Sequence, residues 1–163
     1  MRLDDKALTV VFDVDDDMYD PPTSMENAYL KDSVQFALDP RNDGADMTEF
    51  TLGRLADGTA FLYKNRNYTT PVLPDDITRR GLVAAAQVDF AAREGGWRIR
   101  ARIPLSEVYP LKADATAFGF DFLVNDCDGG KRTFREWTPG IGGAKSAAQF
   151  GHLEPVDDLE SLK

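Results

Sequence analysis

Apolar residues recur at every second position in several separate segments of the chain, and this period of two is typical of β-strands. Val34, Phe36 and Leu38 alternate with smaller or more polar residues, and the same pattern returns in 97–103 and 118–125. No helical pattern longer than about a turn or two is present. Short strands at this spacing, about eight to ten in all, predict an all-β fold, an antiparallel β-sandwich or jelly roll with at most short helical turns.

The expected strands are bounded by turn-forming residues. In chain order they cover 8–14, 34–38, 47–55, 60–63, 82–90, 97–103, 118–125, a segment that ends at 137, and 149–153. Gly95-Gly96 predicts a hairpin between two of them, and Pro104–Val108 could form one helical turn with proline at its start. A turn is expected over 126–131 and a Gly/Ala-rich loop over 138–148.

Length and composition indicate one folded domain. The chain has 163 residues, of which 42% are hydrophobic, and this excludes a disordered chain. We place the domain at 1–155 and a C-terminal tail at 156–163. Cys127 is the only cysteine, so neither an intrachain disulfide nor a cysteine-based zinc site can form.

The charge balance limits the partners. Nineteen basic against 28 acidic residues give a net charge of −9, which argues against nucleic acid and anionic membrane surfaces. No stretch reaches about 18 apolar residues, so no membrane-spanning helix is expected. The N-terminal residues lack the basic and apolar regions of a signal peptide, so none is expected in this chain.

Acidic residues in two segments suggest a structural calcium ion, because hard cations prefer clustered oxygen ligands. The first segment is 13–17, and the second is 125–130, where Asp126 and Asp128 carry oxygens at alternate positions before two glycines. A solvated acidic turn and a Gly-rich hairpin are the respective alternatives, because the distal glutamate of an EF-hand loop is missing.

Arginine and tryptophan side chains offer candidate ligand contacts. Arg98, Arg100 and Arg102 share one face of a strand and could bind acidic sugars, or they could pair with acids such as Asp89 or Asp121. Trp97 is in phase with apolar residues, so we expect it in the core, whereas Trp137 lies at a strand end and could stack on a sugar ring. No catalytic motif is present, so we do not expect an enzyme.

Several segments in order resemble a known family. The chain is similar to the family 9 carbohydrate-binding modules and their relatives in the DOMON-like β-sandwich superfamily. The segments that carry the resemblance are DDKALTVVFDVDDD (4–17), DSVQFALDPRND (32–43), GWRIRARIPLSEV (96–108), FGFDFLVNDCDGGKR (118–132) and FGHLEP (150–155). Together they cover most of residues 4–155.

The resemblance implies a non-catalytic module that binds polysaccharide or oligosaccharide, often contains structural calcium, and is attached to a secreted polysaccharide-degrading enzyme. It places the first sugar-stacking aromatic at Tyr29 and a polar contact at Gln35, where the family usually has Glu. Arg54, Asn125 and Trp137 complete the expected sugar site. The family's second stacking tryptophan would be expected between Trp137 and Phe150, where this chain has no aromatic residue.

Two other functions stay open. One is a haem-binding electron-transfer domain of the same superfamily, with His152 and one of Met18, Met25 or Met47 as axial ligands. We expect His152 to be packed within the last strand. The other is a structural or docking sandwich that binds no small ligand.

Overall fold

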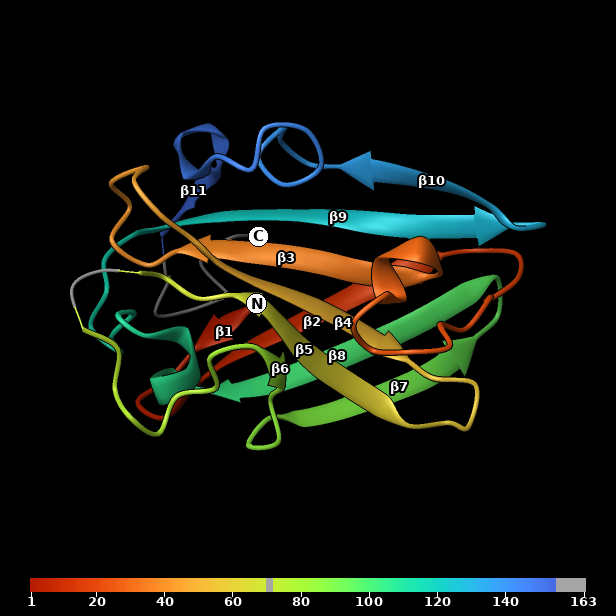
Figure 1. Ribbon diagram of the computed structural model, residues 1–163, viewed down its shortest axis with the longest axis horizontal. Helices are drawn as coiled ribbons and strands as arrows, with labels where there is room; N and C mark the ends of the chain where they lie inside the picture. The colour runs from red at the N-terminus through yellow and green to blue at the C-terminus, as the bar shows by residue number, and fades with distance from the viewer. Residues whose placement is uncertain (70–71, 155–163) are drawn as a thin grey trace, which may run out of the picture.

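Two antiparallel sheets face each other and enclose the core in the computed structural model, which describes residues 1–69 and 72–154 (Figure 1). The predicted all-β sandwich is therefore confirmed. The four-stranded sheet has the order β1 (Arg2–Leu3), β2 (Ala7–Asp15), β8 (Gly96–Pro104), β7 (Gln87–Arg93). The predicted tail at 156–163 lies outside the described residues.

The larger sheet has seven strands. Six of them have the order β10 (Lys131–Glu136), β9 (Phe118–Asp128), β3 (Ser33–Asp39), β4 (Thr48–Arg54), β5 (Ala60–Arg66), β6 (Gly81–Leu82). The seventh, β11 (Gly151–Leu153), pairs with β9 beyond the end of β10. Three 3-10 turns connect the strands: η1 (Ala28–Leu30), η2 (Leu105–Val108) and η3 (Ala147–Gln149). In the described part of the chain, no helix has the length and apolar character needed to cross a bilayer.

The apolar face of each alternating strand points between the sheets. Phe36, Phe50 and Leu52 from the larger sheet and Ile99 and Trp97 from the smaller one are almost fully buried in one cluster. The Nε1–H of Trp97 donates to Asp16 at 2.8 Å, so this polar group keeps a partner inside the fold. The expectation that Trp97 belongs to the core is confirmed.

Two strands differ most from the predicted ones. Strand β9 continues through Asp128, because Gly129 and Gly130 alone, with φ of 58° and 82°, form the two-residue turn into β10. The predicted strand 82–90 is divided, because its beginning (β6) pairs with β5 and its end (β7) pairs with β8 in the opposite sheet.

The arginine row of β8 lies on the outer face of the smaller sheet and is largely paired. Arg98 donates to Asp13 through Nε at 2.7 Å and Nη2 at 2.9 Å, and Arg102 donates to Asp4 at 2.8 Å. These acids come from the neighbouring strand β2 and its preceding turn rather than from Asp89 or Asp121. The paired interpretation therefore holds for Arg98 and Arg102, with other partners than expected.

One ion pair is buried inside the sandwich. Lys64 of β5 is fully buried, and its Nζ lies 2.6 Å from Oε2 of Glu107 in η2. Glu107 also accepts hydrogen bonds from the backbone N–H of Thr78 at 3.1 Å and from its hydroxyl at 2.8 Å. Burial lowers the pKa of Lys64 below its ordinary value, and only the carboxylate partner opposes this effect.

We expect Lys64→Met to destabilise the fold by about 3–5 kcal/mol, because it leaves the Glu107 carboxylate buried without its cation. The double variant Lys64→Met/Glu107→Gln removes both charges and should recover much of this loss. Chemical denaturation of the three proteins measures both effects. Equal stability of Lys64→Met and the wild type would contradict the structural role given to this pair.

Candidate functional site

The outward face of the larger sheet carries a row of polar side chains across four strands. Strand register places Asn125 of β9 between Ser33 of β3 and Phe134 of β10, and it places Gln35 opposite Thr51 of β4. Side chains on neighbouring strands at paired positions point to the same face. Two of the predicted site residues, Gln35 and Asn125, therefore lie side by side on this face.

Hydrogen bonds connect the side chains of this row from β10 to β4, and each side chain donates to the next. Arg132 donates from Nε (3.0 Å) and Nη2 (2.6 Å) to Oδ1 of Asn125, whose amide donates to Gln35 at 3.4 Å. Gln35 donates to Oε1 of Glu49 at 3.0 Å, and Lys145 donates to the same oxygen at 2.7 Å. Each amide thus has a fixed orientation between a guanidinium and a carboxylate, and such chains reinforce one another in a low dielectric.

The row has a buried floor and an exposed rim. Gln35, Glu49 and Asn125 are almost completely buried. Tyr29 and Phe134, in contrast, expose about two-fifths of their surface, at 40% and 42%. The guanidinium of Arg132 lies 5.7 Å from the ring centre of Tyr29 and 5.0 Å from that of Phe134. We call the two rings together with Arg132 and Lys145 the rim.

Tyr29 is held in place by the residues that follow it. It belongs to η1, and the hydroxyl of Ser33 donates to the carbonyl of Ala28 at 2.9 Å. The buried carboxylate of Asp32 accepts the backbone N–H of Cys127 at 2.7 Å and that of Asp20. Asp32 therefore ties the segment that carries Tyr29 to the end of β9.

The Gly/Ala-rich loop after β10 brings Lys145 to the row. Oε1 of Glu136 accepts the backbone N–H of Ile141 at 2.6 Å, and Ile141 packs in a small cluster on this face with Leu123 and Phe150. Gly142 lies so close to Phe134 that a Cβ there would be 2.6 Å from the ring. A residue without a side chain is needed where the loop passes this ring.

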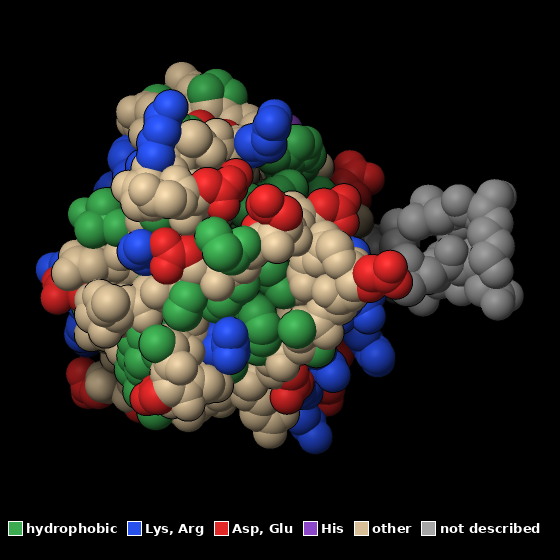
Figure 2. Space-filling view, turned by 90° about the vertical axis from the view of Figure 1, so that its right-hand side faces the viewer, with side chains coloured by type: hydrophobic (Ala, Val, Ile, Leu, Met, Phe, Trp, Pro, Cys, Tyr) green, Lys and Arg blue, Asp and Glu red, His purple; other side chains and the backbone are tan. Residues whose placement is uncertain are grey.

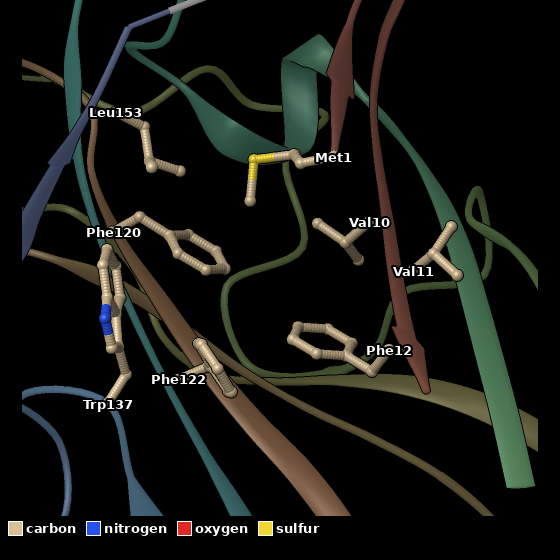
Figure 3. A pocket seen from close by; sticks show the side chains of 8 residues that line it. All are labelled: Met1, Val10, Val11, Phe12, Phe120, Phe122, Trp137 and Leu153. Carbon is tan, nitrogen blue, oxygen red and sulfur yellow. The ribbon is translucent and has the colours of Figure 1, made fainter. Parts of the chain in front are cut away.

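Two predicted site residues lie elsewhere. Trp137 packs on the inward side of the sheet against Phe122, with ring centres 6.0 Å apart, and lines an apolar slot between the open edges of the two sheets (Figure 3). Arg54 lies over the rings of Tyr19 and Phe90, at 5.1 and 4.7 Å. Tyr29, Gln35 and Asn125 form one group, whereas Trp137 and Arg54 are separated from it by the sheet.

Four residues of the site were missed by the sequence analysis: Glu49, Arg132, Phe134 and Lys145. The Gly129-Gly130 turn was a signal for two of them, Arg132 and Phe134. In a two-residue hairpin, positions equally far from the turn pair with each other, so Gly129-Gly130 pairs Asn125 with Phe134 and Phe122 with Trp137, as observed. Glu49 and Lys145 meet only through the folded loop, and no local pattern indicated their contact.

The predicted calcium residues lie at the end of the sandwich where β9 turns into β10. Acidic side chains gather on this end of the molecule (Figure 2), and the neighbouring charge of Asp126, followed by that of Asp17, raises the pKa of Asp128. Within 1–69 and 72–154, however, no three His, Cys, Asp or Glu side chains lie close enough to hold a metal ion. The calcium role expected for Asp126 and Asp128 therefore stays a prediction.

The residues considered for haem lie in different surroundings. His152 is exposed on β11 and is hydrogen-bonded to Asn42, so the expectation that it is packed is wrong. Met47 is buried with Ile141 and Phe150, and Met18 is exposed.

Comparisons with known proteins agree with this fold. The model of the family "Carbohydrate family 9 binding domain-like" matches residues 1–157. A family 9 carbohydrate-binding module from Caldicellulosiruptor kristjanssonii in complex with cellotriose has a TM-score of 0.65 at 20% identity, covering 98% of this chain and 74% of that one. A structure of such a module from the same organism in complex with glucose has a TM-score of 0.66 at 23% identity, covering 96% of this chain and 75% of that one. A search of curated proteins gave no match.

The fold and the family match define the class of protein. The chain belongs to the carbohydrate family 9 binding domain-like family, and the resemblance seen in the sequence is confirmed. Members of this family are non-catalytic carbohydrate-binding modules. The two solved structures, both below 25% identity, show the likeness of the fold.

Asp32 makes the stability of the fold depend on pH. Burial raises the pKa of its carboxyl to about 6, from an ordinary value of 3.8, and the two backbone N–H donors only partly oppose this. Because the folded-state pKa is the higher one, protonation favours the fold, and this contribution grows as the pH falls from 7 to 5. Between pH 7 and pH 5 the gain in the free energy of unfolding from this carboxyl is about 1 kcal/mol.

We therefore expect the free energy of unfolding of the wild type, minus that of Asp32→Asn, to rise by about 1 kcal/mol between pH 7 and pH 5. Urea titrations at the two pH values measure it. The subtraction removes the titration of the other carboxyl groups. A difference that stays constant or falls would contradict the raised pKa.

The lack of a third His, Cys, Asp or Glu ligand beside these acids within the described residues also gives a testable expectation. A calcium ion bound only by the folded state would raise the melting temperature. We expect the same melting temperature in millimolar calcium and in EDTA. A clear rise in calcium that Asp128→Asn abolishes would show that these acids rearrange around a cation.

Proposed function

We propose that the rim of the larger sheet binds oligosaccharide, with Tyr29 and Phe134 as the contacts to the sugar rings. The observation that carries this proposal is the pairing of two exposed aromatic rings with a cation held by a row of oriented amides. Aromatic faces cover the apolar face of a pyranose, and fixed N–H donors bind its hydroxyl groups. Phe134 takes the place of the second aromatic that the loop after Trp137 lacks.

Within this site the buried residues position the exposed ones. Asn125 fixes the guanidinium of Arg132 through two hydrogen bonds, and Glu49 fixes Lys145. Arg132 and Lys145 then donate to the sugar with side chains whose rotamers are already restricted. Such preorganisation lowers the entropy cost of binding. Gln35 connects the two halves and acts as a positioning residue.

The identity of residue 35 fits this arrangement. Its amide donates to Glu49 at 3.0 Å, whereas a glutamate there would place a second carboxylate beside the first in a buried position. Like charges at such a distance are unfavourable. Glutamine therefore keeps the hydrogen bond and avoids this repulsion, which supports a site built around the single carboxylate of Glu49.

The wider role follows from the family. The module would hold a polysaccharide-degrading enzyme outside the cell on its substrate, as part of a larger protein. Cellotriose and glucose, found with the two similar modules, are the first sugars to test. Family membership is the support for this role.

We expect Tyr29→Ala and Phe134→Ala each to weaken the binding of cellotriose about five- to thirtyfold, because each removes one stacking face worth about 1–2 kcal/mol. Isothermal titration calorimetry measures the affinity. The matched control is Trp137→Ala, which removes an exposed aromatic ring from the opposite side of the same sheet and should leave the affinity unchanged. Melting curves show that each variant is folded.

The opposite result would overturn the assignment. If Trp137→Ala abolishes binding while Tyr29→Ala and Phe134→Ala do not, the sugar binds in the slot between the sheets. If the folded wild type binds no sugar of a broad panel, the alternative of a structural or docking sandwich is favoured.

A further inference from the structure

The guanidinium of Arg132 is the one rim cation with no carboxylate partner among the described residues. Lys145 is paired with Glu49 at 2.7 Å. Arg132 takes part in none of the ion pairs within 1–69 and 72–154, and its two hydrogen bonds both go to the neutral amide oxygen of Asn125. Its side chain is partly exposed. A full positive charge therefore lies at the site with no carboxylate of the described residues in ion-pair contact with it.

The hydrogen bonds to Asn125 leave a defined part of the guanidinium free. Arginine has five N–H groups, and Asn125 uses the one on Nε and one on Nη2. Both N–H groups of Nη1 and one of Nη2 remain. Of these, one on Nη1 and the one on Nη2 point in parallel from the end of the guanidinium, and such an edge binds a carboxylate through two parallel hydrogen bonds. The rings of Tyr29 and Phe134 flank the same guanidinium.

We propose that this site selects oligosaccharides that carry a carboxylate, such as a terminal uronic acid, and that Arg132 is the residue that selects them. This inference rests on the proposed sugar-binding function and names its substrate class. The two rings would hold the pyranose and the free guanidinium edge would bind its carboxylate. Discrimination is strong in such an arrangement, because a neutral sugar leaves the cation without a partner.

The test compares cellotriose with cellotriose oxidised at C6 of its terminal residue, which differ only in one carboxylate. At pH 7 and low salt, calorimetry should give an affinity for the oxidised sugar about tenfold higher or more. The preference should shrink as the salt concentration rises, because counter-ions screen a partly exposed pair.

Three variants assign the preference to Arg132. Arg132→Gln keeps an amide that can donate to Asn125 and should reduce the preference to less than twofold. Arg132→Lys keeps the charge without the planar fork and should give an intermediate ratio, which decides the question if Arg132→Gln is unfolded. Arg135→Gln removes the same charge from the opposite face of β10 and should leave the ratio unchanged.

The outcomes separate this inference from the proposed function. If the wild type binds both sugars equally or prefers the neutral one, or if the preference survives in Arg132→Gln, the carboxylate inference is overturned and sugar binding stands. If neither sugar binds to the folded wild type, the proposed function fails as well.

Discussion

The register of the β9–β10 hairpin decides which residues share each face of the larger sheet. Gly129 and Gly130 both adopt positive φ, so the turn has two residues and pairs Asn125 with Phe134. A slip of one residue would move every side chain of β10 to the other face. Arg132 and Phe134 would then point into the slot between the sheets, and the outward row would lose its cation and one of its rings.

The outward face is stabilised without a large apolar cluster. The carboxylates of Glu49 and Asp32 each accept donors from two chain segments, and that of Glu136 accepts backbone donors from the loop after Trp137. These contacts hold Lys145, the Tyr29 segment and the loop around the row. Buried carboxylates need such partners, because an unpaired charge in a low dielectric is costly. The same contacts therefore stabilise the fold and orient the site.

Sequence reasoning predicted the fold well, because the period of two in β3, β8 and β9 is strong and local. It identified Tyr29, Gln35 and Asn125 for one face through the family resemblance. It grouped Trp137 with these residues, because Trp137 was judged from its position at a strand end and not from its distance to the Gly129-Gly130 turn. The structure places Trp137 on the inward side of the sheet. Lys145 and Glu49 are 96 residues apart, and Lys145 lies in a loop without periodicity, so their contact could be known only from the folded chain.

The central claim is that sugar binds on the outward face of the larger sheet and not in the slot beside Trp137. Amide and side-chain NMR shifts during a cellotriose titration test it most directly, because both regions report in one experiment. We predict the largest changes at Tyr29, Arg132 and Phe134, with Val11, Phe122 and Trp137 unaffected. Changes concentrated at Trp137 and Val11, with Tyr29 and Phe134 unmoved, would contradict the account.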